Sequence, residues 1–261
     1  MLQLLRRIPL IRQVGSWYIH TFLEGSVTPI RTGHARGLLW VRRRRYLHSM
    51  WLGDYETALQ EALVKLLAPG QTFYDIGANA GFFSLLASRM VGPDDRVFSV
   101  DPDRANHAHM QELKKHNQLA HWALLQEAVD GQPGTMRFEY SFEGDSGGRL
   151  GQRQNFEGDD PSRLTNFYEV PTTTFDHLFE RHGKPDVVKI DIEGSEFESF
   201  KTGAERLLTE YRPAMILELH GLDRARYVTE RLQQQGYSIS QLDGTPATFV
   251  QNAIYHVVAQ P

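Results

Sequence analysis

The sequence predicts an α/β fold in which a mostly parallel sheet is covered by helices on both faces. From residue 57 onward, apolar runs of strand length alternate with segments of helical periodicity, which is typical of this architecture. Residues 73–88 read as a strand, a glycine turn and a helix, which supports the same class. With 261 residues and 41% hydrophobic side chains, the chain can fill a sizeable core.

The first half of the sheet is predicted from three short apolar runs. Each run is followed or preceded by a segment whose apolar residues recur at helical spacing, as Phe82, Leu85 and Leu86 do. In chain order, the expected elements are a helix at 56–67, a strand at 72–76, a helix at 79–90, a strand at 96–101, a helix at 103–117 and a strand at 123–128.

The second half repeats this alternation after an interruption. "TMRFEYS" and "YEVPTTTFDHL" have the pattern of a hairpin. Between them, residues 141–168 are glycine-rich and aperiodic, and we expect them to form a lid, a binding loop or a disordered segment. The elements expected after the hairpin are a strand at 186–191, a helix at 194–209, a strand at 213–219, a helix at 222–235 and strands at 237–242 and 252–259.

Basic charge is concentrated in residues 1–50, which contain nine Arg, no Lys and a single acid, Glu24, for a charge of +8. Since the whole chain carries −4, residues 51–261 carry −12. We therefore predict an Arg-rich extension at 1–50 and a main domain at 51–261. The extension suits an anionic partner such as lipid headgroups at a membrane surface, a charged glycan or nucleic acid, or it is an ordinary solvated face.

The sequence also bears on the compartment. Without cysteine, the chain can form neither a disulfide nor a thiolate metal site, which fits a reducing environment. Arg6, Arg7 and Arg12 interrupt the apolar residues at the start of the sequence, so neither a membrane span nor a secretion signal is expected. We expect a cytoplasmic protein, and the sequence does not indicate its oligomeric state.

The segment "FYDIGANAGFFSLLAS" (73–88) predicts a cofactor site. Its strand ends in Asp75, its turn contains Gly77 and Gly81, and its helix begins with N–H groups free to bind a ligand. The turn lacks the third glycine of a dinucleotide fingerprint. A pyrophosphate would be repelled by Asp75, whereas the ammonium and sulfonium of S-adenosylmethionine would not. S-adenosylmethionine is therefore favoured over a nicotinamide dinucleotide.

A second acid, Asp101, ends the next strand, 20 residues after Gly81. An acid at this distance is placed to accept both ribose hydroxyls of a cofactor. The alternative for Asp75 and Asp101 is ordinary turn and helix-cap chemistry. Glu127 and Ala128 end the third strand, where they could face the adenine.

Charged residues occur within the predicted strand "VVKID" (187–191). Alternation puts Lys189 and Asp191 on one face, and because parallel strands are buried on both faces, Lys189 needs a partner such as Asp191. Glu218 and His220 likewise share a face of the following strand. If the two strands are neighbours, Asp191, Glu218 and His220 converge at the edge of the sheet where such folds bind ligands.

Glu193 and Glu196 lie three residues apart at the predicted start of a helix. They could share one face of its first turn and join the site, although acids are favoured there by the helix dipole in any case. His220 alone could be a structural histidine, but its acidic neighbours make it a candidate base.

These segments together resemble the FkbM family of S-adenosylmethionine-dependent methyltransferases. The match covers roughly residues 50–245, and its most specific part is the K-x-D-x-E-G-x-E pattern. In the family's order, the matching segments are "GDYE" (53–56), "DIGANAGFFS" (75–84), "VDPD" (100–103), "VPTTTFDHL" (170–178), "VVKIDIEGSEFESFKTG" (187–203) and "ILELH" (216–220).

The resemblance implies a seven-stranded class I methyltransferase fold and methylation of a hydroxyl, commonly on a sugar or a natural product. It implies cofactor binding by Asp75, Gly77, Asn79, Gly81 and Asp101. It implies an acceptor side lined by Lys189, Asp191, Glu193, Glu196, Glu218 and His220. Asp101 stands where many relatives have Glu, a change that should keep ribose binding. The extension and residues 141–168 are not carried over, and we expect them to govern acceptor choice.

Methyl transfer to a hydroxyl requires a base near an in-line acceptor oxygen. We expect His220 or Asp191 to take the proton, with Lys189 holding Asp191 ionised and oriented. The acceptor would be a small molecule or a glycan, and the Arg-rich extension would suit an anionic one. A divalent metal held by the acids and His220 is a less favoured alternative, because the spacing matches no fixed metal motif. A nucleic-acid methyltransferase, a nicotinamide dehydrogenase and a non-catalytic binding module are further, less favoured readings.

Overall fold

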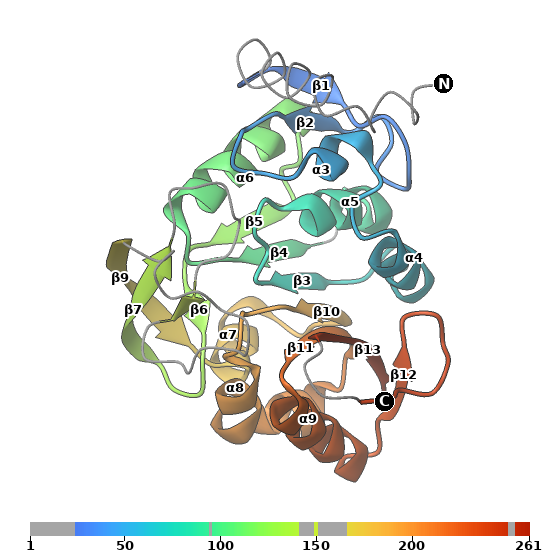
Figure 1. Ribbon diagram of the computed structural model, residues 1–261, viewed down its shortest axis with the longest axis vertical. Helices are drawn as coiled ribbons and strands as arrows, with labels where there is room; N and C mark the ends of the chain where they lie inside the picture. The colour runs from blue at the N-terminus through green and yellow to red at the C-terminus, as the bar shows by residue number, and fades with distance from the viewer. Residues whose placement is uncertain (1–23, 94–95, 141–148, 151–165, 250–253) are drawn as a thin grey trace, which may run out of the picture.

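The computed structural model describes residues 24–93, 96–140, 149–150, 166–249 and 254–261. The strands of its main sheet are β3 (Phe73–Ile76), β4 (Val97–Val100), β5 (Trp122–Leu125), β10 (Val187–Ile190), β11 (Ala214–His220), β12 (Ser238–Gln241) and β13 (Ile254–Gln260). They lie in the order β12-β13-β11-β10-β3-β4-β5 (Figure 1). Strands β11, β10, β3, β4 and β5 pair in parallel, whereas β13 is antiparallel to both of its neighbours. The predicted mostly parallel sheet is confirmed.

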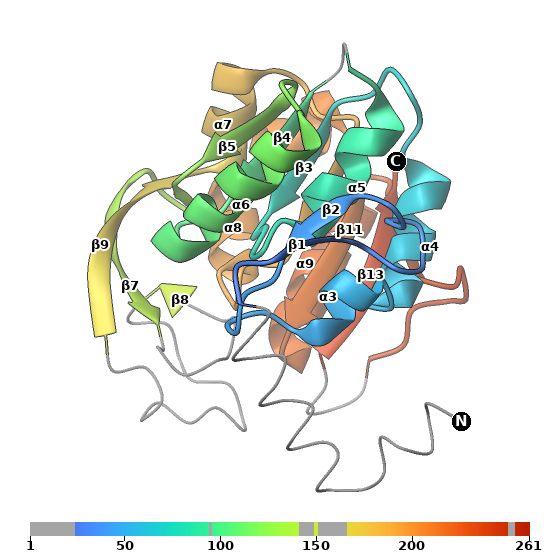
Figure 2. The ribbon, with the colours of Figure 1, turned by 90° about the horizontal axis from the view of Figure 1, so that it is seen from above.

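Helices cover both faces of this sheet, as predicted. One face carries α4 (Thr57–Leu66), α5 (Phe82–Val91) and α6 (Arg104–Asn117). The other carries α7 (Phe175–His182), α8 (Glu196–Thr202), the π-helix η2 (Leu207–Tyr211) and α9 (Leu222–Gln234). Figure 2 shows these two helical layers from above. No helix among the described residues has the length and apolar character needed to cross a membrane.

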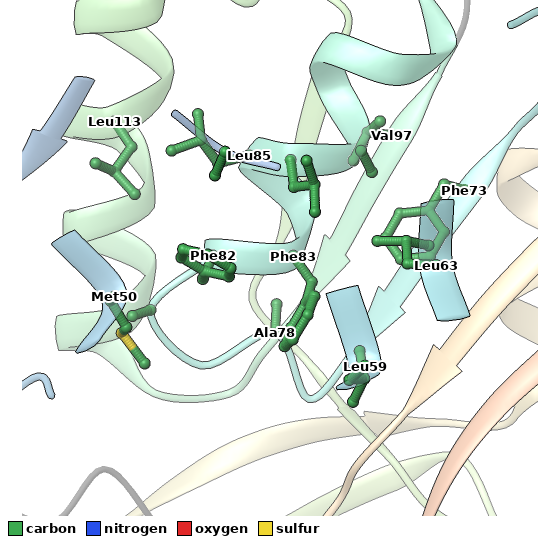
Figure 3. Close-up of a cluster of buried hydrophobic side chains, with 14 of the residues drawn as sticks. Met50, Leu59, Leu63, Phe73, Ala78, Phe82, Phe83, Leu85, Val97 and Leu113 are labelled. Atoms are coloured by element: carbon green, nitrogen blue, oxygen red, sulfur yellow. The ribbon is translucent and has the colours of Figure 1, made fainter. Parts of the chain in front are cut away.

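The strands are buried on both sides because successive residues face opposite helical layers. Phe73 and Val187 belong to the hydrophobic cluster beneath α4 and α5, part of which Figure 3 shows. Their neighbours Tyr74 and Val188 belong to the cluster on the other face. A charged side chain in such a strand, like that of Lys189, therefore reaches the polar surroundings it needs only near the end of the strand.

Part of the Arg-rich extension packs onto the main domain. Its strands β1 (Val27–Pro29) and β2 (Leu39–Val41) pair antiparallel, and α3 (His48–Leu52) follows. Trp40 and Met50 are buried in one cluster with Phe82 of α5, and Figure 3 shows Met50 and Phe82 of this cluster. The boundary between residues 50 and 51 falls within α3 and stays a prediction. Residues 1–23 of the extension lie outside the described residues.

A second, smaller sheet lies beside the main one (Figure 1). Its strands are β6 (Ala128–Val129), β7 (Gly134–Tyr140), β8 (Arg149–Leu150) and β9 (Asn166–Thr173), in the order β6-β9-β7-β8. The antiparallel pairing of β7 with β9 confirms the predicted hairpin. Most of the predicted loop at 141–168 falls outside the described residues, which include only its members 149–150 and 166–168.

Two expected elements are divided in the structure. The strand expected at 123–128 ends at Leu125, and Ala128 pairs instead with Thr172 of β9. The helix expected at 194–209 is replaced by α8, which stops at Thr202, and the π-helix η2, which begins at Leu207.

Two helices also differ from expectation at their starts. The helix expected from residue 79 begins at Phe82, because Asn79 and Gly81 adopt left-handed backbone conformations. Residues 175–182, which the sequence placed partly in the hairpin, form α7. Its N-cap is Thr174, whose hydroxyl accepts a hydrogen bond from the His177 amide at 3.2 Å.

Candidate active site

A cleft opens at the carboxyl ends of β3, β4 and β10, with a volume of about 570 Å³ including the part open to solvent. Its lining brings together seven residues predicted from the sequence: Gly77, Asn79, Asp101, Glu127, Ala128, Asp191 and Glu193. They come from four separate strand ends, and the sheet order places those ends side by side. This is the edge at which open α/β sheets bind ligands.

Asp101 is buried at the base of the cleft and held by three donors. One carboxylate oxygen accepts a hydrogen bond from the Asn79 amide at 2.7 Å. The other accepts from the Asp103 amide at 2.9 Å and from the side-chain amide of Asn106 at 3.1 Å. Burial raises the pKa of Asp101 to about 7, against the effect of these donors. Because a carboxylate offers about four acceptor positions, Asp101 can still accept a hydrogen bond from a ligand.

The glycine turn brings the backbone close to the cleft. Gly77 has a φ of +77°, and a Cβ atom there would lie 1.6 Å from the carbonyl oxygen of Asp191. Only glycine therefore fits where the β3 and β10 loops meet. Asn79 has a φ of +50°, and its side-chain oxygen is buried with no hydrogen-bond partner among the described residues.

Glu127 and Ala128 lie where the chain leaves the main sheet for the smaller one. Glu127 lines the cleft, and its carboxylate accepts two hydrogen bonds from the Arg181 guanidinium at 2.7 and 2.8 Å. Phe138 and Leu150 of the smaller sheet add an apolar wall. Sequence reasoning missed these two residues, because nothing in the hairpin pattern says which of its side chains faces the cleft.

Asp75 and Gly81 are not among the residues that line the cleft. Asp75 is completely buried, and it accepts a hydrogen bond from the Ser84 hydroxyl at 2.6 Å. Gly81 begins α5, where a Cβ atom would lie 2.6 Å from Met110 and 3.1 Å from Trp122. The structure thus gives Gly81 a packing role and places Asp75 beneath the site.

Lys189 connects Asp75 to the cleft. Its ammonium lies 3.4 Å from Asp75 and 3.5 Å from Asp191, and it donates a hydrogen bond to the Gly77 carbonyl at 3.2 Å. Burial alone would lower the pKa of Lys189, but the carboxylates of Asp75 and Asp191 outweigh burial and raise it. Lys189 is therefore a permanent cation, and Asp75 and Asp191 supply the partners that a charge in a buried strand requires.

Asp191 lies between the cleft and a cluster of acids. Burial raises the pKa of Asp191 to about 8; Lys189 opposes this effect, and the nearby carboxylates of Glu218 and Glu193 add to it. One of its oxygens faces Lys189, while the other is buried without a hydrogen-bond partner among the described residues. A carboxylate with a pKa near neutrality is suited to accept a proton from a substrate.

His220 is surrounded by the predicted acids. Its Nδ1 lies 3.4 Å from Glu196, and its Nε2 lies 3.3 Å from Glu218 and 3.6 Å from Glu193. Burial alone would lower the pKa of His220, but hydrogen bonding to Glu196 and Glu218 raises it to about 11. The ring is therefore a cation at neutral pH and holds these acids together.

Glu196 and Glu218 face His220 from different elements. Glu196 is buried at the start of α8, and its carboxylate accepts a hydrogen bond from the Ile192 amide at 3.1 Å. Glu218 contacts His256 of β13 at 2.9 Å. Burial would raise the pKa of Glu218, but the two histidines lower it, so that Glu218 is ionised.

Three residues near this cluster escaped the sequence analysis. His256 lies opposite Glu218 in the β11–β13 register, and the alternation that selected His220 could have found it. Glu56 adopts a left-handed conformation with φ +40° and helps to raise the pKa of Lys189. Burial raises the pKa of Tyr55, and Glu56, Asp191 and Glu218 raise it further. Tyr55 and Glu56 could have been found through the "GDYE" segment (53–56), which matches the FkbM family but from which no site residue was predicted.

The strand order, the glycine turn after β3 and the acid at the end of β4 define a class I methyltransferase with S-adenosylmethionine as its cofactor. Residues 75–239 match the sequence profile of the family described as the methyltransferase FkbM domain, and the chain belongs to that family. The resemblance seen in the sequence is thereby confirmed. No curated protein sequence matches the chain.

Three solved structures that the chain resembles are the following. The methyltransferase FkbM from Methylobacillus flagellatus KT is 15% identical with a TM-score of 0.49, and the alignment covers 83% of this chain but 56% of that one. The precorrin-6y C5,15-methyltransferase from Geobacter metallireducens GS-15 is 18% identical with a TM-score of 0.45, covering 76% and 84%. The Aeropyrum pernix fibrillarin, with bound S-adenosyl-L-methionine, is 11% identical with a TM-score of 0.44, covering 77% and 72%.

The residues of the cleft fit this cofactor. Asp101 has acceptor capacity left, and the buried Asn79 oxygen needs a donor; ribose hydroxyls are donors that could serve both. The acids at the other end, Asp191 and Glu193, would suit the positively charged methionine part. Between them, Gly77 lines the cleft.

Proposed function

We propose that this methyltransferase acts on a hydroxyl group of a small molecule or a glycan. The cofactor, when bound, supplies an electrophilic methyl group. A hydroxyl oxygen becomes an adequate nucleophile only if a base removes its proton as the new bond forms. The protein must therefore present a base beside the cofactor cleft and hold the acceptor in line with the methyl group.

The observation that carries the proposal is the position of Asp191. It lines the cofactor cleft, and one of its oxygens is buried without a hydrogen-bond partner among the described residues. Its other oxygen lies 3.5 Å from the Lys189 ammonium. We assign Asp191 as the base, because its side chain lines the cleft and Lys189 fixes the orientation of its carboxylate.

His220 was the other candidate base, and its surroundings favour a different role. An imidazole whose pKa is raised to about 11 already carries its proton at neutral pH and cannot accept another. We propose that protonated His220 holds Glu193, Glu196 and Glu218 in place around the acceptor. These carboxylates can accept hydrogen bonds from further hydroxyls.

The residues that line the cleft favour an acceptor with several hydroxyl groups. Asp191 and Glu193 offer hydrogen-bond acceptors, and Phe138 and Leu150 offer an apolar surface. A sugar ring has both an edge of hydroxyls and a less polar face, so it can use both walls. A neutral or positively charged acceptor suits the acidic surface of Asp191 and Glu193 better than a negatively charged one.

The test is to incubate the full chain with isotopically labelled S-adenosylmethionine and a panel of acceptors. The panel should contain free sugars, glycans and hydroxylated natural products, together with amines and RNA. We expect label only in products in which NMR shows the methyl carbon bonded to oxygen. Turnover confined to amines, to carbon acceptors or to RNA would refute O-methylation while leaving the family assignment intact.

A metal-assisted variant of the reaction is the second candidate. Asp191, Glu218 and His220 each offer a ligand atom, and these atoms lie within 4.8 Å of one another. Such a site would suit a hard divalent ion that orients the acceptor oxygen, although His220 would first have to lose its proton. Turnover that survives dialysis against EDTA would exclude this variant, and loss restored by Mg²⁺ or Mn²⁺ would establish it.

A further inference from the structure

We infer that Arg45 and Tyr46 of the Arg-rich extension are positioning residues for the cofactor's ribose, acting through Asp101. This inference rests on the proposed role of Asp101 as the acceptor for ribose hydroxyls. Neither residue lines the cleft; each contacts a residue that in turn donates a hydrogen bond to Asp101. A segment outside the predicted main domain thereby becomes part of the machinery for cofactor binding.

The first connection runs from Tyr46 through Asn106. The Tyr46 hydroxyl donates to the side-chain oxygen of Asn106 at 2.9 Å, and the Asn106 amide nitrogen donates to Asp101 at 3.1 Å. All three side chains are buried. Because Tyr46 donates to its oxygen, the amide of Asn106 is fixed with its nitrogen toward Asp101. Without the hydroxyl, the amide could turn its oxygen toward the carboxylate, which would be repulsive.

The second connection runs from Arg45 through Asp103. The Arg45 guanidinium forms an ion pair with Asp103, which is the N-cap of α6 and accepts hydrogen bonds from the amides of Ala105 and Asn106. The Asp103 amide donates to Asp101 at 2.9 Å. Arg45 therefore neutralises a carboxylate beside Asp101 and fixes the turn that carries one of its donors.

Arg43, in the same segment, serves as a control for the effect of attaching the extension to α6. Arg43 forms an ion pair with Glu112 at 2.6 Å, farther along α6. Both arginines thus join the extension to the same helix, but only Arg45 does so beneath the cleft. An effect that comes merely from attaching the extension to α6 should appear in variants of either arginine. An effect on ribose binding should appear only with Arg45 and Tyr46.

The experiment compares the conservative variants Tyr46→Phe, Arg45→Gln and Arg45→Lys with the control Arg43→Gln. Binding of S-adenosylmethionine is measured by calorimetry, and kcat is measured at saturating cofactor. We expect Tyr46→Phe and Arg45→Gln each to raise the Kd about tenfold, as for loss of one hydrogen bond to a charged group. We expect Arg43→Gln to leave both kcat and the Kd unchanged. Arg45→Lys should bind the cofactor more tightly than Arg45→Gln, because it keeps the positive charge.

A double-mutant cycle with Asp101→Asn then tests the route. If Tyr46 acts through Asp101, Tyr46→Phe will weaken binding much less in the Asp101→Asn background than in the wild type. Equal effects in both backgrounds, or equal losses in the Arg43 and Arg45 variants, would overturn the inference. If Asp101→Asn itself leaves the Kd unchanged, then Asp101 does not bind the ribose. That outcome differs from one in which Asp101 binds the ribose but Arg45 and Tyr46 do not act through it. Thermal unfolding of each variant confirms that the protein compared is folded.

Discussion

Gly77 and the backbone carbonyl of Asp191 lie so close together that no side chain fits between them, since a Cβ atom on Gly77 would be 1.6 Å from that oxygen. The Asp191 amide also donates a hydrogen bond to the Ile76 carbonyl at 2.9 Å. The cofactor turn after β3 and the loop that carries the proposed base are therefore one structural unit. A substitution that displaces the backbone of either should disturb both cofactor binding and catalysis.

Replacement of Gly77 tests this unit. Gly77→Ala should weaken cofactor binding more than tenfold, because the new methyl group must push the two loops apart. Gly70→Ala is the matched control, since Gly70 also has a positive φ, +87°, but nothing lies within 4 Å of a Cβ atom there. Gly70→Ala should lower the free energy of unfolding by only about 1–3 kcal/mol and leave the Kd unchanged. Equal effects of the two substitutions on the Kd would contradict the proposed contact.

Removal of the proposed base should separate chemistry from binding. Asp191→Asn keeps the size of the side chain but cannot accept a proton, so kcat should fall by about 10²–10⁴. The Kd for S-adenosylmethionine should change far less. The exposed Asp223→Asn in the first turn of α9 serves as control and should leave both quantities unaltered. Undiminished kcat in Asp191→Asn would remove Asp191 from the mechanism.

The dependence of the rate on pH should report Asp191. Because burial and neighbouring acids raise its pKa to about 8, the fraction ionised, and with it kcat, should rise with pH through that region and then level off. The profile should be measured between about pH 6 and pH 10 in the wild type and in Asp191→Asn. The residual rate of the variant should lack this rise, and a rate that falls across the same range would point to a general acid.

The stability of the fold should depend on pH through His220. Its pKa is about 11 in the folded protein against an ordinary 6.5, so the folded state binds the proton more tightly than the unfolded state. The stabilisation is complete below about pH 6.5 and is lost progressively as the pH rises toward 11. Urea unfolding of the wild type and of His220→Gln should therefore differ most near pH 6 and least near pH 10. A difference that grows with pH would show that His220 is neutral in the folded protein.

Much of the site could be predicted because strand ends follow simple rules. Alternation within two strands and the strand–glycine turn–helix pattern were enough to bring Asp101 and Asp191 to one cleft. The position of Asp75 could not be predicted in this way. The sequence predicts that it ends a strand, but β3 continues to Ile76. Within β3 its register partner in β10 is Lys189, so its carboxylate pairs with that lysine beneath the cleft. Register between strands far apart in the chain is not readable from one sequence.

The fold was least predictable where long-range packing overrides local pattern. Gly81 resembles a ligand-binding glycine, yet its close neighbours are Met110 and Trp122, which are distant in the sequence. The row of arginines at 42–45 resembles a surface for an anionic partner. Arg43 and Arg45 instead form ion pairs with α6, and Arg42 stacks on Trp51. The prediction of an anionic partner stays untested. Arg42, Arg43 and Arg45 already contact other residues of the chain, so fewer arginines are available to bind such a partner.

The apolar wall formed by Phe138 and Leu150 comes from a sheet that, among the described residues, shares no strand pairing with the main one. The acids and the cofactor turn lie at the strand ends of the main sheet, so the two walls of the cleft come from different sheets. We therefore expect that exchanging the hairpin between family members would change the proposed acceptor surface and leave the proposed base in place. In this architecture, a change of the β7–β9 hairpin could alter which substrates are accepted, while the residues proposed for methyl transfer stay the same.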